Sequence, residues 1–85
     1  MILHTINKPE KLRSCKELIE DSDLVLLLED GVYLANDPIP GVVHALRTDL
    51  LARGFKILEK QKITLIDYKE FVELTYRADK ICAWF

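Results

Sequence analysis

Five short runs of apolar residues along the chain predict five β-strands. Residues 24–28 are apolar at every position, which is typical of an inner parallel strand whose two faces are both covered. Residues 2–6 place Ile2, His4 and Ile6 on one face, and residues 42–46, 63–66 and 81–85 form the other three runs. We therefore expect one sheet of five strands.

A helix is predicted directly after the first strand. Asn7 can accept a hydrogen bond from a backbone N–H of the first turn, Glu10 can reach back, and Pro9 is tolerated there. On this helix Leu12 and Cys15 fall on one apolar stripe, whereas charged residues lie on the opposite side. The stripe indicates that the helix packs on the sheet.

Three aspartates are predicted to cap the later helices. Asp30 precedes residues 31–36, Asp49 precedes residues 50–53, and Asp67 precedes residues 68–77. Gly54 is expected to end the second of these helices, and the prolines within residues 36–41 predict a surface loop. Aspartates at strand ends could also be catalytic carboxylates, but a position one residue before a helix is ordinarily that of a cap. We therefore interpret all three as structural.

The alternation of strands and helices predicts the α/β class. It favours a three-layer α/β/α arrangement around a mainly parallel five-stranded sheet, in a single domain that spans residues 1–85. Functional groups in such folds gather beyond the carboxyl ends of the strands. Those ends are residues 5–7, 29–31, 47–49 and 67–68.

Charge and hydropathy narrow the classes of function. The chain carries 12 basic and 14 acidic residues, a net charge of −2, so nothing favours direct binding to nucleic acid or to a membrane surface. Its longest apolar run, residues 24–28, is far shorter than the roughly 20 residues of a membrane span. Because the N-terminus also lacks the pattern of a signal peptide, we expect a cytoplasmic protein.

The chain is also expected to have a partner. A domain of 85 residues buries only about 60–65% of the surface of its unfolded chain, so a second subunit would add needed stability. Apolar residues around Tyr33, Leu34 and Ile39, next to the proline loop, are the expected contact surface. In a homodimer two copies of this surface would meet.

No cofactor and no metal ion are expected. The sequence lacks the glycine-rich loops that bind phosphates or dinucleotides. The potential metal ligands stand apart along the chain, without the paired spacing of a metal site. They are Cys15, Cys82, His4 and His44. Each histidine occupies the middle of a predicted strand, so we interpret both as hydrogen-bonded core residues.

Cys15 is the candidate nucleophile of the chain. Lys11 and Lys16 flank it and would favour its thiolate, and an accessible helix would make it more reactive than Cys82. Its place on the apolar stripe fits a buried and inert thiol equally well, so both interpretations stay open. Cys82 lies beside Trp84 in the last strand and is interpreted as a packing residue.

Several segments, taken in order, resemble one family of proteins. They are residues 2–8 (ILHTINK), 27–33 (LLEDGVY), 49–55 (DLLARGF), 66–68 (IDY), 71–75 (FVELT) and 83–85 (AWF). Together they resemble the DsrH/TusB family of sulfur-relay proteins, and the resemblance runs from end to end of the chain. It implies a three-layer fold similar to that of the DsrE and DsrF families.

The resemblance also implies a function and partners. Such proteins pass persulfide sulfur between proteins, either for 2-thiolation of the tRNA wobble uridine or in oxidative sulfur metabolism. The implied partners are DsrE/TusD-like and DsrF/TusC-like proteins, with a homodimer as the alternative, and the principal sulfur-carrying cysteine lies on the DsrE/TusD-type subunit. Cys15 matches the first-helix cysteine of DsrH-type members. The chain is therefore expected to be either a sulfurtransferase component with Cys15 as sulfur acceptor or a non-catalytic structural subunit.

Overall fold

The computed structural model describes all 85 residues and contains one sheet of five strands. The strands are β1 (Ile2–Ile6), β2 (Leu24–Leu27), β3 (Val42–Leu46), β4 (Thr64–Ile66) and β5 (Lys80–Trp84). Their order in the sheet is β4-β3-β2-β1-β5, and every neighbouring pair is parallel. The predicted parallel five-stranded sheet is confirmed.

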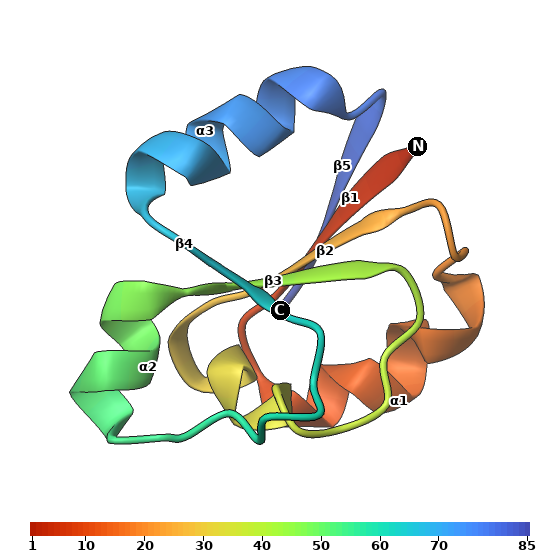
Figure 1. Cartoon of the computed structure of the whole chain (residues 1–85). Coiled ribbons are helices and arrows are strands. Elements are labelled where there is room, and N and C mark those ends of the chain that lie inside the picture. Colours follow the sequence, from red (N-terminus) through yellow and green to blue (C-terminus); the bar gives the residue numbers. More distant parts are fainter.

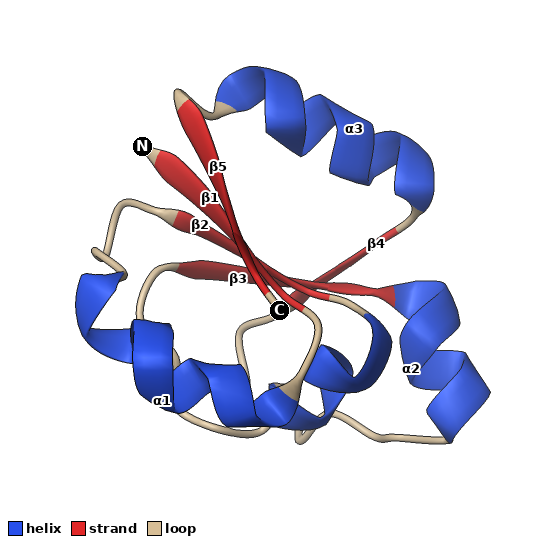
Figure 2. Ribbon diagram, turned by 180° about the vertical axis from the view of Figure 1, so that it is seen from behind, coloured by secondary structure: helices blue, strands red, loops and turns tan.

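Helical segments cover both faces of this sheet. The α-helices are α1 (Leu12–Cys15), α2 (Arg47–Arg53) and α3 (Tyr68–Arg77), and the 3₁₀ segments are η1 (Pro9–Lys11), η2 (Lys16–Leu18) and η3 (Glu29–Leu34). Figure 1 shows α3 on one side of the sheet and α1 and α2 on the other, and Figure 2 shows the same layers from behind. The predicted three-layer α/β/α architecture is confirmed.

Strand order explains this division of the helices. From β1 to β4 the chain moves steadily toward one edge of the sheet, and right-handed crossovers then place each connection on the same face. From β4 the chain returns past three strands to β5, which puts α3 on the opposite face. One helix of 10 residues therefore covers that face by itself.

The hydrophobic core lies in two clusters, one on each face of the sheet. Alternate residues of β2 enter both clusters: Val25 and Leu27 face α1, whereas Leu24 and Leu26 face α3. All four residues of β2 are buried. This confirms the prediction of an inner strand with two covered faces.

Asp67 is the one predicted cap that forms. Its side chain accepts a hydrogen bond from the backbone N–H of Glu70 at 2.8 Å, and the Glu70 carboxylate accepts one from the Asp67 N–H at 3.3 Å. Asn7 does not cap the first helix, because Lys8 is still extended and η1 starts one residue later than predicted. The side-chain oxygen of Asn7 is instead buried without a hydrogen-bond partner.

The predicted caps Asp30 and Asp49 are wrong for a shared reason. η3 begins at Glu29 and α2 begins at Arg47, so each helix follows its strand without an intervening turn. Both aspartates consequently lie inside a first helical turn rather than in front of it. Gly54 does end α2, in the left-handed region at φ +58°, which confirms its predicted role.

Candidate functional site

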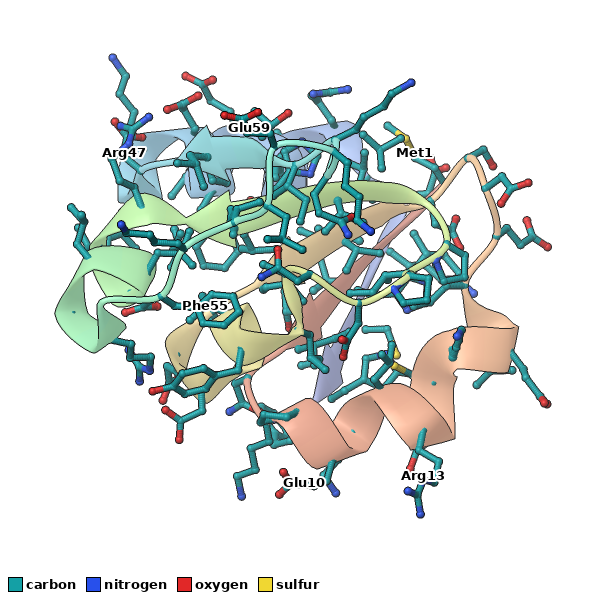
Figure 3. All side chains as sticks on the ribbon, turned by 60° about the horizontal axis from the view of Figure 1, so that its bottom comes forward. Met1, Glu10, Arg13, Arg47, Phe55 and Glu59 are labelled. Atoms are coloured by element: carbon teal, nitrogen blue, oxygen red, sulfur yellow. The ribbon has the colours of Figure 1, made fainter.

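Cys15 lies at the end of α1 and its side chain is fully buried, with 0% exposed. It belongs to the core cluster between the sheet and the α1 layer. The labelled side chains of Glu10 and Arg13 point away from this layer in Figure 3, so the polar side of the segment faces solvent. The expectation that Cys15 is accessible is therefore wrong, because its apolar stripe faces the sheet.

Burial changes the chemistry of this thiol. Loss of hydration raises the pKa of Cys15 and is the largest influence on it, ahead of a backbone hydrogen bond that lowers the pKa. Only the thiolate form of a cysteine is a good nucleophile. Cys15 is therefore a neutral, enclosed thiol in this structure.

Cys82 lies on the same side of the sheet as Cys15. In β5 it is the register partner of His4, and the next partners on the same face of the sheet are Ile6 and Trp84. Because Ile6 and Cys15 share the core cluster on the α1 face, Cys82 must point toward this face as well. Cys82 is half-buried, and both cysteines are free thiols.

His4 beside Cys82 has both ring nitrogens engaged. Its Nδ1 accepts a hydrogen bond from the indole Nε1–H of Trp84 at 3.2 Å, so the ring proton must reside on Nε2. Nε2 lies 3.1 Å from a carboxylate oxygen of Asp23 and donates to it. His4 thus has no free nitrogen to take a proton from a thiol, and its predicted role as a hydrogen-bonded core residue is confirmed.

Asp23 has a role that the sequence did not reveal. Its carboxylate is buried and accepts hydrogen bonds from the backbone N–H groups of Ile2 and Glu20, both at 3.0 Å. These two bonds, with a smaller contribution from His4, lower the pKa of Asp23 to about 2. The available signal was a carboxylate directly before a fully apolar strand, since such a group must find donors when it is buried.

His44 lies on the opposite face of the sheet, under α3. Its Nδ1 lies 3.1 Å from the carbonyl oxygen of Val42 and 3.3 Å from that of Val25, so Nδ1 carries the proton. The residue is buried, which confirms the prediction of a core histidine. The sheet separates His44 from His4, so the two histidines do not form one site.

Arg53 brings together two of the carboxylates predicted at the strand ends. Its Nε donates to Asp30 at 2.8 Å, and its Nη1 lies 3.9 Å from the carboxylate of Asp49. Asp49 also accepts a hydrogen bond from the backbone N–H of Glu29 at 2.6 Å, where the backbone is left-handed at φ +50°. This cluster ties η3 to α2, whereas Asp67 remains apart as a helix cap.

No group of three or more histidine, cysteine, aspartate or glutamate side chains comes together as a metal-binding set. None of the helices has the length and apolar character needed to span a bilayer.

Comparison with known proteins identifies the family of this chain. The family model described as DsrH like protein matches residues 7–81. The chain belongs to the DsrH/TusB family. Protein TusB of Escherichia coli K12 is 36% identical over 95 aligned positions, which cover 98% of this chain and 100% of that protein. Protein TusB of Escherichia coli O81 (strain ED1a) is 35% identical with the same coverage.

A solved structure supports the same conclusion for the fold. The solution NMR structure of protein Tm0979 from Thermotoga maritima superposes with a TM-score of 0.67 at 31% identity. The match covers 91% of this chain and 93% of Tm0979. As a member of the DsrH/TusB family the protein has a role in sulfur relay.

Proposed function

We propose that this chain is a structural subunit of a sulfur-relay assembly that serves 2-thiolation of the tRNA wobble uridine. The observation that carries the proposal is the complete burial of Cys15. Full-length similarity to TusB proteins supports the tRNA branch over oxidative sulfur metabolism. In this proposal the persulfide sulfur is carried by a cysteine of a partner subunit.

Burial matters because sulfur transfer needs an exposed thiolate. The Cys15 thiolate would have to attack the outer sulfur of a partner persulfide, which forms a new persulfide on Cys15 and releases the partner's thiolate. An enclosed thiol with a raised pKa has neither the access nor the charge for this attack. His4 offers no base to remove the proton, since both of its ring nitrogens are engaged.

An apolar face beside α3 supports the subunit assignment. Tyr68 and Val72 lie four residues apart on α3 and are both more than half exposed. Ile81 of β5 is 54% exposed and is the register partner of Leu3, which lies in the cluster under α3. The exposed Ile81 therefore lies on the α3 side of the sheet, at the free edge that β5 forms. We propose that this face receives a DsrE/TusD-like or DsrF/TusC-like chain, or a second copy.

The contact surface expected around Tyr33, Leu34 and Ile39 is wrong in its central residue. Leu34 is buried in the core cluster on the α1 face. The ring of Tyr33 packs edge-on against Phe55, with the ring centres 5.5 Å apart. Figure 3 labels Phe55 on the segment that follows α2. Leu34 is therefore unavailable for contact with a partner, whereas Tyr33 remains 45% exposed.

Sulfur loading tests the proposal. The native chain is exposed to a low-molecular-weight persulfide donor, and intact-mass spectrometry with peptide mapping then locates any added sulfur. We expect none on Cys15. In a reconstituted relay with partner subunits, Cys15→Ser is expected to transfer sulfur at the rate of the unaltered chain. A persulfide on Cys15 of the native chain, together with loss of relay in Cys15→Ser, would contradict the proposal.

A second candidate is that Cys15 accepts sulfur once a partner opens the segment that holds it. The segment from η1 through η2 contains only four α-helical residues, flanked by two 3₁₀ turns of three residues each. Because 3₁₀ hydrogen bonds have poorer geometry, this segment can open locally at low free energy. The same mass measurement distinguishes the candidates: sulfur on Cys15 only in the presence of a partner subunit favours this one.

A further inference from the structure

A cavity of about 510 Å³ opens where the segments leading into β3 and β4 meet the start of η2. Its hydrophobic lining residues are Ile39, Val43 and Ile63. Volumes of about 300–1,000 Å³ are typical of sites for small molecules. The cavity belongs to none of the groups discussed so far, because the thiols, both histidines and the Arg53 cluster are absent from its lining.

The rim of the cavity is basic although the chain as a whole is acidic. Three lysines line it, Lys16 from η2 and Lys60 and Lys62 from the loop between α2 and β4, against one carboxylate, Asp37. None of the four ion pairs of the molecule includes a lysine. The chain carries a net charge of −2, so the cavity is a local excess of positive charge. Uncompensated ammonium groups around a concave surface concentrate anions there.

Asn36 holds the two loops of this rim together. Its side chain donates to the carbonyl of Lys56 at 3.0 Å and accepts from the backbone N–H of Leu58 at 2.8 Å. Gln61, between the two rim lysines of the loop, donates to the backbone carbonyl of Asn36 at 3.0 Å. Figure 1 shows both segments below the sheet, and Glu59 marks the longer loop in Figure 3. Because these bonds fix the two loops relative to each other, less ordering is required when a ligand binds.

We propose that this cavity binds a small molecule through a phosphate group. Lysine ammonium groups are compact point charges that suit the several oxygens of a phosphate, and three of them suit a diphosphate better than a single carboxylate. The hydrophobic lining residues then contact the organic part of the ligand, such as the sugar and base of a nucleoside diphosphate. The free inorganic anion would satisfy the lysines but would make no use of the hydrophobic lining. This inference does not depend on the proposed role in sulfur relay.

An NMR titration of the full-length chain tests the site. Inorganic diphosphate and a nucleoside diphosphate are titrated separately at constant ionic strength, and the amide signals of Ile39, Gly41 and Ile63 are followed. We expect saturable shifts at these positions with both probes, and tighter binding of the nucleoside diphosphate. Each single change Lys16→Gln, Lys60→Gln or Lys62→Gln is expected to weaken binding about five-fold, the effect of one removed charge near the surface.

A control variant distinguishes binding at the cavity from general electrostatic attraction between the anionic probes and the chain. The triple change Lys8→Gln, Lys69→Gln and Lys80→Gln removes three charges from exposed lysines outside the cavity, more than any single rim variant removes, and is expected to leave binding unchanged. Equal weakening by the control and the rim variants overturns the proposal, as does the absence of saturable shifts with either probe. Equal affinity for the two probes would mean that the cavity recognises only the phosphate groups and binds the free inorganic anion. Binding of a single-stranded RNA oligomer without binding of diphosphate also overturns the proposal.

Discussion

Trp84 donates its indole N–H to Nδ1 of His4 at 3.2 Å, and so ties the last strand to the first across 80 positions of the chain. The two rings are nearly parallel, at 19°, with their centres 6.4 Å apart. Through Nε2, His4 also donates a hydrogen bond to Asp23, which directly precedes β2. The side chains of Trp84, His4 and Asp23 thus link three neighbouring strands in addition to their backbone pairing, and two of them, His4 and Asp23, are buried.

Trp84→Phe is expected to lower the free energy of unfolding by about 1–3 kcal/mol, because Nδ1 of His4 then lacks a donor in a buried place. The phenyl ring keeps an aromatic surface at the position but has no N–H. Urea titration measures the effect, and Tyr76→Phe is the control, since Tyr76 is exposed on α3. Unchanged stability of Trp84→Phe would show that the hydrogen bond contributes nothing.

Because the pKa of Asp23 is lowered in the folded chain, we expect the fold to lose stability in acid. Its pKa in the folded chain is about 2, below the ordinary value of 3.8, so its stabilisation is complete above about pH 4 and is lost as the pH falls toward 2. The lowered pKa corresponds to about 2 kcal/mol. We expect urea midpoints to fall over this range.

Asp23→Asn is the variant that isolates this effect. The asparagine is uncharged at every pH, and its NH₂ group would meet the Nε2–H of His4 or the backbone donors that Asp23 now accepts from. We expect it to be less stable at pH 7 by about 1–3 kcal/mol and to lose the part of the acid dependence between pH 4 and 2. An acid dependence identical to that of the unaltered chain would assign the effect to other carboxylates.

An aspartate that caps a helix and an aspartate that forms an exposed ion pair are expected to contribute differently to stability. Asp67→Ala removes a capping box and is expected to lower the free energy of unfolding by about 1 kcal/mol. Asp30→Ala removes an ion pair in which the aspartate side chain is 63% exposed, and is expected to change stability by less than about 0.5 kcal/mol. Denaturant titration of both variants measures which of the two losses in unfolding free energy is larger. A larger loss for Asp30→Ala would mean that the Arg53 cluster stabilises η3 more than its exposure suggests.

Local patterns predicted most of this fold and little of its polar network. The apolar run of β2 and the cap at Asp67 could be predicted because both depend on residues close in sequence. The predicted cap at Asn7 is wrong because Lys8 continues the extended backbone and η1 begins only at Pro9, a shift of one residue that a pattern of residue types does not encode. The contacts of Trp84 and Asp23 depend on strand order and could not be predicted, since several orders are compatible with the same alternation.

The two thiols are expected to differ in reactivity in the folded chain. Cys15 is fully enclosed and its pKa is raised by burial, whereas Cys82 is half-buried at the sheet edge. Limited alkylation at pH 7, followed by peptide mapping, should therefore label Cys82 first. Both cysteines should react at similar rates in denaturant, which is the control for intrinsic reactivity. Preferential labelling of Cys15 in the native chain would contradict its burial and favour the role of sulfur acceptor.

The exposed face formed by α3 and β5 should be the surface that meets another subunit. Val72→Glu and Ile81→Glu each place a charge where apolar area would be desolvated, so each is expected to weaken assembly about ten-fold or more. Leu51→Glu is the control, because Leu51 is 74% exposed on α2, away from this face. Sedimentation with and without candidate partner subunits measures the assembly. A mass near 9.8 kDa that persists at high concentration and with those partners, or equal weakening by Leu51→Glu, would remove the support for the subunit assignment.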